Sequence, residues 1–449
     1  MELSENSKTT ATTTGEYLVA QDLADAWPVL SRPDRFEAFR LMSRGEAEEF
    51  FLSRPAANQH ELLQSLPPQE QRSWMRLLAP DDAADVVQHA SDEERPLLLA
   101  LLDEPTREEV NALLAYAEDR AGGLMSPRYA RVRADVAVNE AVSYLRRQAR
   151  AQVETIYVAY VLDEGQRLLG VVSFRDLFAA DPGKRVRDVM RTDFVRVTDQ
   201  EDQETVSRLF AEHALSAIPV VDAEGRMKGI VTVDDIVDVV QEEATEDAQK
   251  FGGMEALDAP YLQIALGRMI KKRAGWLAAL FLGEMLTATA MAYFEDEIAR
   301  AVVLAMFVPL IISSGGNSGS QASTLVIRAM ALDEVRLRDW WRVSRREVVT
   351  GIALGTILGC IGFLRIVVWQ AVKPTYGAHY LLIAATVFFS LLGVVLFGTL
   401  AGSLLPFLLR KLKLDPASAS APFVATLVDV TGLVIYFTMA SILLRGTLL

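Results

Sequence analysis

Long apolar runs are confined to the part of the chain after residue 273, whereas the preceding residues mix apolar and polar positions. Five of these runs are long enough to cross roughly 30 Å of hydrocarbon as helices. They cover residues 274–294, about 299–327, 348–372, 380–409 and 422–444. The pattern therefore predicts an all-α transmembrane domain of five helices over residues 273–449.

Apolar residues recur every three or four positions between residues 21 and 123, which predicts short helices. The segments LPPQE (66–70) and APDD (79–82) each place proline at a first helical turn with acids behind it. We expect a compact, superhelical N domain over 21–123. The polar, Thr- and Ser-rich residues 1–20 before it read as a disordered tail.

Valine- and isoleucine-rich strands alternate with helices over 124–245, where the chain repeats itself at an offset of 59 residues. VLDE (161–164) and GVVSFRD (170–176) match VVDA (220–223) and GIVTVDD (229–235). Each copy reads as strand, turn, strand and a helix capped by Ser173 or Thr232. The repeat predicts two α/β modules. Residues 246–272 are expected to form a connecting helix, its part beyond the break at Gly252-Gly253 leading into the membrane.

Charge divides the chain at the same boundary. Residues 1–272 carry 49 acidic and 31 basic side chains, a net charge of −18, and residues 273–449 carry 10 and 14, a net charge of +4. An acidic soluble half argues against nucleic-acid binding and suits cation attraction or solubility.

The single Cys360 cannot form an intrachain disulfide, and four histidines make a His-based zinc site improbable. No nucleophile with a base and no Gly-rich phosphate loop is present, so we expect no enzyme.

Basic residues predict the orientation of the five spans. The N-terminus lacks the basic and apolar regions of a secretory signal. Arg300 and Lys373 are the only basic residues of one set of connections, whereas the other set carries many. By the positive-inside rule, this set is cytoplasmic. The sequence thus predicts a multi-pass protein of the cell (inner) membrane, with its N-terminus in the cytoplasm and its C-terminus outside. The inner basic residues are Arg268, Lys271, Lys272, Arg273, Arg328, Arg336, Arg338, Arg342, Arg345, Arg346, Arg410, Lys411 and Lys413.

Two spans carry polar residues at membrane depth. PLIISSGGNSGSQAS (309–323) contains Asn317 and Gln321, whose amides need protein or water partners, while its small residues can also serve helix packing. The last span places Asp429 about eight residues from its cytoplasmic end. Inserting a charged carboxylate into the membrane at such a position costs about 2.5–3.5 kcal/mol of free energy. An ion-binding role explains this carboxylate. A structural pairing with Glu284 or Arg365 is the alternative.

The last strand of the repeat leads into an acidic helix. Asp235, Asp238, Glu242 and Glu246 fall close to one face of it, where their mutual repulsion is unfavourable unless cations bridge them. A solvated acidic face is the alternative.

The motifs PLIISSGGNSGSQ and ATLVDVTG resemble the membrane signatures of the MgtE family of magnesium channels, and residues 124–245 resemble tandem CBS modules. The order of domains also matches that family. The resemblance implies a homodimer in membrane lipid with one shared pore, in which Asp429, Asn317 and Ala425 surround a magnesium ion. Hydrated Mg²⁺ suits such a site because it loses its water shell reluctantly.

The resemblance also implies a Mg²⁺-selective channel for uptake that closes when cytoplasmic Mg²⁺ bridges acidic surfaces. A divalent-cation carrier or exporter with CBS regulation is the alternative. The resemblance to CBS modules further implies that ATP or another adenine nucleotide contacts two residue pairs, Ser173 with Asp176 and Thr232 with Asp235. The same pairs are also typical of an ordinary helix start. The matched sensing positions are Asp81, Asp85, Asp235, Asp238, Glu246, Asp247 and Asp415.

Overall fold

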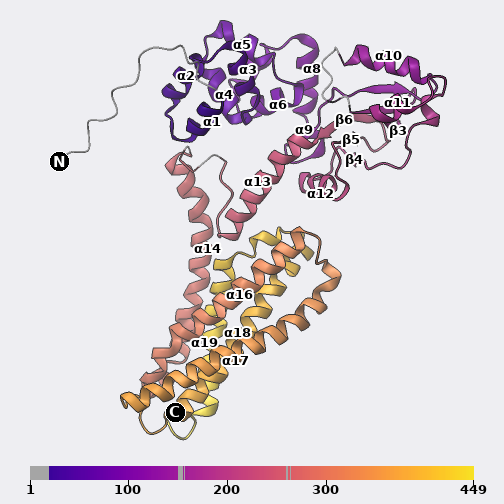
Figure 1. The fold of residues 1–449 in the computed structure, drawn as a ribbon. Coiled ribbons are helices and arrows are strands. Elements are labelled where there is room, and N and C mark those ends of the chain that lie inside the picture. The colour runs from indigo at the N-terminus through magenta and orange to yellow at the C-terminus, as the bar shows by residue number, and fades with distance from the viewer. Residues whose placement is uncertain (1–19, 150–154, 156, 259–260, 263, 449) are drawn as a thin grey trace. The chain divides into compact units, whose positions relative to one another are not determined.

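The computed structural model describes residues 20–149, 155, 157–258, 261–262 and 264–448, so the expected tail over 1–20 lies almost wholly outside the described residues. The chain forms two compact units, Met1–Gln241 and Glu242–Leu449. Figure 1 shows short helices and two small sheets in the first unit and long helices in the second. The predicted multi-domain class is confirmed: a helical N domain, a pair of α/β modules and five apolar helices.

The N-terminal helices begin where the sequence signals predict. Pro68 and Pro80 lie in the first turns of α5 and α6, and Ser43 forms a capping box with Glu46 at the start of α3. Aromatic side chains fill the core between them, including Trp27, Phe50 and Trp74. The helices are α1 (Ala20–Ala26), α2 (Arg32–Arg40), α3 (Arg44–Leu52), α4 (Ala56–Ser65), α5 (Pro68–Met75), α6 (Pro80–Gln88), α7 (Arg95–Leu99), α8 (Glu104–Leu113) and α9 (Ala121–Leu124).

The repeated segment folds as two equivalent three-stranded sheets, in the orders β1-β2-β3 and β4-β5-β6. In each sheet the first strand pairs parallel and the last antiparallel to the middle one. Val158 pairs with Ser173 and Ala217 with Thr232, which preserves the offset of 59 residues. The elements are β1 (Arg131–Arg133), α10 (Val138–Gln148), β2 (Val158–Leu162), β3 (Leu168–Ser173), α11 (Phe174–Ala179), β4 (Val197–Thr198), α12 (Gln203–His213), β5 (Ala217–Val221), β6 (Met227–Thr232) and α13 (Val233–Phe251).

The connecting segment differs from the prediction. α13 runs through the acidic residues and ends at Phe251, and the described residues between 252 and 265 are not helical. The next helix, α14, begins at Leu266 and continues into the first span. Gly253 explains the break, because it adopts φ +74° and a Cβ there would lie 2.9 Å from Trp276 Nε1. The expected connecting helix over 246–272 is therefore two helices joined by a turn.

All five predicted spans are present in the second unit. They comprise α14 (Leu266–Tyr293), η3 with α16 (Val302–Phe307 and Val308–Ala331), η4 with α17 (Leu337–Asp339 and Trp340–Val372), α18 (Tyr380–Lys411) and α19 (Ala421–Leu443), with the short α15 (Glu295–Arg300) after the first. A Cβ on Gly402 would lie 2.0 Å from Gly319 O, and one on Gly398 2.3 Å from Gly315 O. These glycines let α16 and α18 meet backbone to backbone.

Candidate ion-binding sites

Asp429 lies in α19, eight residues after its start at Ala421, and its side chain is half-buried within the single chain. α16 runs antiparallel beside this helix. A Cβ on Gly315 would lie 2.7 Å from Val428 Cγ1, and one on Gly319 2.7 Å from Val424 Cγ1. The packing thus brings the two polar motifs of the membrane half together, as the sequence predicts.

Asn317 lies between the two glycines that pack against α19. Its neighbour Gly316 approaches Ala425, where a Cβ would lie 3.6 Å from the Ala425 Cα. Asn317 and Gln321 are exposed in the single chain, whereas Gly315 and Gly319 are buried. The motif therefore divides into a packing face of glycines and a polar face that the chain's own helices leave uncovered. Ala425, half-buried, lies one turn before Asp429 on α19.

The alternative structural partners of Asp429 do not neutralise it. Among the described residues, Glu284 of α14 is the charged side chain whose field reaches Asp429, and its charge has the same sign. α14 can come close because a Cβ on Gly283 would lie only 3.0 Å from Thr426 Cγ2. Arg365 is exposed on α17, and among the residues that the structure describes it forms no ion pair with Asp429. A cation bound near Asp429 and Glu284 would relieve the repulsion between their negative charges.

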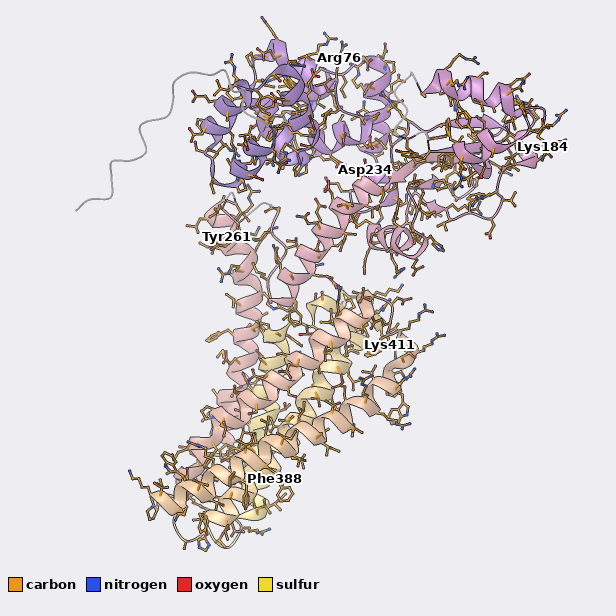
Figure 2. The ribbon with its side chains drawn as sticks, in the orientation of Figure 1. Arg76, Lys184, Asp234, Tyr261, Phe388 and Lys411 are labelled. Carbon is orange, nitrogen blue, oxygen red and sulfur yellow. The ribbon has the colours of Figure 1, made fainter. Side chains whose placement is uncertain are left out.

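In the first unit, acids of α6 and α13 repel one another. Asp235 is partly buried at the start of α13, where its Oδ2 accepts hydrogen bonds from the Thr232 Oγ1 (2.5 Å) and the Thr232 N (3.3 Å). Burial raises the pKa of Asp235 to about 7, and the charges of Asp234 and Asp82 act in the same direction against the Thr232 hydrogen bonds. Figure 2 marks Asp234 at this end of α13.

Asp82 of the N domain, which is not among the sequence-predicted sensing residues, is subject to the charges of α13. Burial raises the pKa of Asp82, and the charges of Asp234 and Asp238 raise it further. The predicted Asp81 and Asp85 lie on the same helix, Asp81 buried and Asp85 exposed. The sequence signal was present, because all three acids occupy the first two turns of α6.

We expect this buried carboxyl to make stability depend on pH. The folded-state pKa of Asp235, about 7, lies above its ordinary value of 3.8, so between these values the folded chain holds a proton that the unfolded chain has released. The unfolding free energy contributed by this group is therefore fully present below about pH 4 and is lost as the pH rises through 7. Asp235→Asn should remove this loss, stabilising the protein at pH 8 by roughly 1–2 kcal/mol.

Thermal unfolding of the full-length protein at low Mg²⁺, at pH 5 and pH 8, measures this effect. Asp176→Asn, the equivalent position of the first repeat, serves as the matched control. Equal losses of stability between the two pH values in wild type and Asp235→Asn would contradict the assignment.

A second acidic group surrounds Lys250 near the end of α13. The Lys250 Nζ donates to Asp415 Oδ2 at 2.6 Å and also pairs with Glu246. Burial alone would lower the pKa of Lys250, but the hydrogen bonds to Asp415 and Glu246 outweigh it and raise the pKa. Asp247 lies beside this group, and burial together with the charges of Asp415 and Glu243 raises its pKa. The structure thus brings together Glu246, Asp247 and Asp415, with a lysine among them that the sequence reasoning did not consider.

The predicted nucleotide residues take part in helix starts. The Ser173 Oγ accepts a hydrogen bond from the Asp176 N at 3.0 Å and caps α11, and Thr232 donates to Asp235 at the start of α13. Asp176 also pairs with Arg191 at 3.4 Å. Both Ser/Thr–Asp pairs therefore have a structural role in the chain as it stands.

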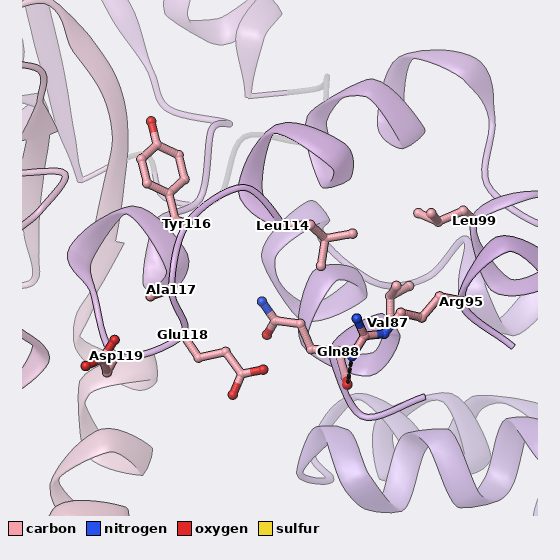
Figure 3. Close-up of a pocket in the computed structure, with 9 residues that line it drawn as sticks. All are labelled: Val87, Gln88, Arg95, Leu99, Leu114, Tyr116, Ala117, Glu118 and Asp119. Atoms are coloured by element: carbon pink, nitrogen blue, oxygen red, sulfur yellow. Dashed lines mark hydrogen bonds between the residues drawn. The ribbon is translucent and has the colours of Figure 1, made fainter. Parts of the chain in front are cut away.

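A pocket of about 570 Å³ lies where the N-terminal helices lead into the first repeat (Figure 3). Two of its polar side chains make hydrogen bonds within the chain: Arg95 Nη2 donates to Gln88 O at 3.2 Å and Tyr116 Oη donates to Asp199 Oδ2 at 3.3 Å. It contains none of the predicted site residues. In the described part of the chain, no three or more His, Cys, Asp or Glu side chains are placed to hold a metal ion by themselves.

Comparison with known proteins finds matches to the N domain, the CBS pair and most of the membrane half. Family models match at residues 308–439 (MgtE, divalent cation transporter), 18–119 (MgtE intracellular N domain) and 121–183 with 186–242 (CBS domain). The magnesium transporter MgtE of Thermus thermophilus is 44% identical over 369 residues, which are 82% of this chain and 80% of the relative. That of Enterococcus faecalis is 34% identical over 337 residues, covering 75% and 72%.

A solved structure of the cytosolic domain of the Mg²⁺ channel MgtE in complex with ATP is 43% identical, with a TM-score of 0.47, and covers 50% of this chain and 92% of that one. The membrane signatures, the CBS pair and the identity to full-length relatives agree. The chain belongs to the MgtE family of magnesium transporters.

Proposed function

We propose that this protein is a Mg²⁺ channel of the cell membrane that admits Mg²⁺ into the cytoplasm and closes when cytoplasmic Mg²⁺ rises. In this assignment residues 21–123 form the N domain, 124–245 the CBS pair and 273–449 the pore domain. The observation that carries the proposal is Asp429, a half-buried carboxylate within a membrane-spanning helix, beside a polar face that the chain itself leaves uncovered.

A second copy of the chain accounts for that uncovered face. Most homo-oligomers are twofold symmetric, and such an axis beside α16 and α19 would bring two Asp429 carboxylates toward each other. Asn317 on the uncovered face of α16 and Ala425, which lies against Gly316 of the same helix, would line the same path. Mg²⁺ keeps several of its waters, so carboxylate and amide oxygens can bind the hydrated ion through them. We therefore propose a homodimer with one shared pore.

The direction of transport and the gate rest on charge. The basic residues at the connections support an orientation with the N-terminal half inside and the C-terminus outside. Carboxylates repel one another in two groups, one around Asp235 and Asp82 and one around Glu246 and Asp415. Mg²⁺ bound in either group would therefore favour compact arrangements of the chain. Closure by Mg²⁺ at the proposed sensing residues, which also include Asp81, Asp85, Asp238 and Asp247, follows from that preference.

Current recording across a lipid bilayer tests the proposal. We expect purified protein to give unitary Mg²⁺ currents that fall as Mg²⁺ on the cytoplasmic side is raised. A carrier, the alternative function, alternates access with each cycle and would give transport without unitary currents. Flux without unitary currents would show that the protein is a carrier and not a channel. Currents that do not change with cytoplasmic Mg²⁺ would contradict the proposed closure by Mg²⁺.

Nucleotide binding at the CBS pair remains a prediction. We propose Ser173 with Asp176 and Thr232 with Asp235 as the contacts for ATP or another adenine nucleotide. Binding there would have to exchange the internal hydrogen bonds of both hydroxyls for bonds to the ribose. Titration calorimetry with ATP, ADP and AMP on wild type and on Asp176→Ala tests these contacts.

A further inference from the structure

Lys250 occupies an unusual place among the acids at the end of α13. Its ammonium group contacts Asp415 in the connection between α18 and α19, at 2.6 Å, and Glu246 one turn earlier on its own helix. Lys250 and its two partners are each only partly exposed, at 29%, 40% and 37% for Lys250, Glu246 and Asp415. These contacts form within the second unit of the chain, where α13 meets the loop that begins the last span.

The same junction is held by backbone packing. Lys250 O accepts a hydrogen bond from Gly253 N at 2.9 Å, which closes the turn that ends α13. A Cβ on Gly253 would lie 3.1 Å from Pro422 Cγ, in the first turn of α19. Asp415 also accepts from Ala417 N at 2.8 Å and so fixes the short 3₁₀ turn Pro416–Ser418 before α19. A change at Lys250 is therefore a change at the start of the helix that carries Asp429.

The ammonium group of Lys250 already occupies the position at this junction where a cation would bind Glu246 and Asp415. The carboxylate oxygens of Glu246 and Asp415 that Lys250 contacts are of the type that Mg²⁺ prefers. Lysine supplies a compact ammonium with one positive charge and three donors, whereas Mg²⁺ supplies two charges and an ordered water shell. The two cations cannot use the same oxygen lone pairs in the same geometry. Mg²⁺ that binds Glu246 and Asp415 must displace the ammonium or share the carboxylates with it.

We propose that Lys250 is a built-in competitor of Mg²⁺ at this junction and sets the Mg²⁺ concentration at which the pore closes. This inference rests on the proposed Mg²⁺ gate. With Lys250 present, Glu246, Asp247 and Asp415 carry two uncompensated charges, which one Mg²⁺ neutralises. Without the lysine they carry three, so Mg²⁺ binds more tightly and closure needs less of it.

The variant Lys250→Met keeps the aliphatic length and removes the charge. We expect it to close at a cytoplasmic Mg²⁺ concentration about fivefold lower than wild type, since the ion no longer displaces two partly exposed ion pairs. Lys250→Arg, which keeps the charge, should close within about twofold of wild type. Lys228→Met removes an equivalent lysine–carboxylate pair, with Asp222 at 3.6 Å in the second repeat, and should leave the closing concentration unchanged.

The partner residue supplies the decisive comparison. In an Asp415→Asn background Lys250→Met should have a clearly smaller effect, because only the Glu246 carboxylate is then left for Lys250 and Mg²⁺ to compete for. An unchanged closing concentration in Lys250→Met would overturn the proposal, and a raised one would overturn it by showing that the lysine holds the closed state together. Mg²⁺ titration calorimetry on the full-length variants separates this question from the gate itself. If wild type is not closed by Mg²⁺ at all, the proposed function fails, but tighter Mg²⁺ binding by Lys250→Met would still show competition.

Discussion

Asp429→Ala should reduce Mg²⁺ flux to background while the protein still assembles and unfolds at the wild-type temperature or above it. The reason is that an ionised carboxylate within a span costs about 2.5–3.5 kcal/mol, so removing it relieves the fold even as it removes the proposed ion site. The neighbouring Glu284 repels Asp429, which adds to the cost of keeping both charged. Flux of Mg²⁺ into liposomes, with thermal unfolding in the same detergent, measures both effects.

The two measurements together separate an ion-binding role from a structural one. Asp429→Asn keeps the size of the side chain and should lose flux as the alanine variant does. Asp296→Ala removes an exposed acid from α15 in the same unit and should retain wild-type flux. Normal flux in Asp429→Ala would exclude this carboxylate from the pore, and loss of flux accompanied by a large fall in unfolding temperature would assign it to the fold instead.

Neutralising Asp235, Asp238 and Glu246 together should leave a pore that stays open at Mg²⁺ concentrations that close the wild type. Bridging predicts a large, local effect, and we expect the closing concentration to rise by at least about tenfold. Simple attraction by the net charge predicts much less, because charges more than about 8 Å away are screened at physiological salt. Bilayer recordings of the triple variant, made with Ala or Gln, provide the measurement.

A control with the same change of net charge tests locality directly. Glu93, Glu108 and Glu212 are exposed acids outside α13, and their replacement by Gln should leave closure unchanged. Limited proteolysis gives an independent view of the same equilibrium, since a ligand that binds only the compact state suppresses opening. Added Mg²⁺ should protect the linkers near Gly122 and Gly252 in wild type and much less in the triple variant. Equal protection with unchanged closure would show that the acidic face is merely solvated.

The sequence by itself determined the spans, the repeat and the identity of the polar residues at membrane depth. Apolar length is dictated by the bilayer, so the five helices could be read without knowing how they pack. The gapless match at an offset of 59 predicted two equal modules, and both sheets keep that register. Pro80 and the acids after it marked the start of α6 for reasons local to one turn.

Only the tertiary structure decided which of these residues meet. Gly315 and Gly319 turn toward α18 and α19, which leaves Asn317 on the uncovered face, and no periodicity distinguishes those directions in a run of small residues. Gly253 packs closely against Trp276 of α14 and Pro422 of α19, which no local pattern reveals, and the helix expected directly beyond it begins only at Leu266. Asp82 is subject to the charges of Asp234 and Asp238 on α13, and Lys250 reaches Asp415 across 165 positions of sequence. Electrostatic interactions fall off with distance in space, and spacing along the chain does not reveal that distance until the helices have packed.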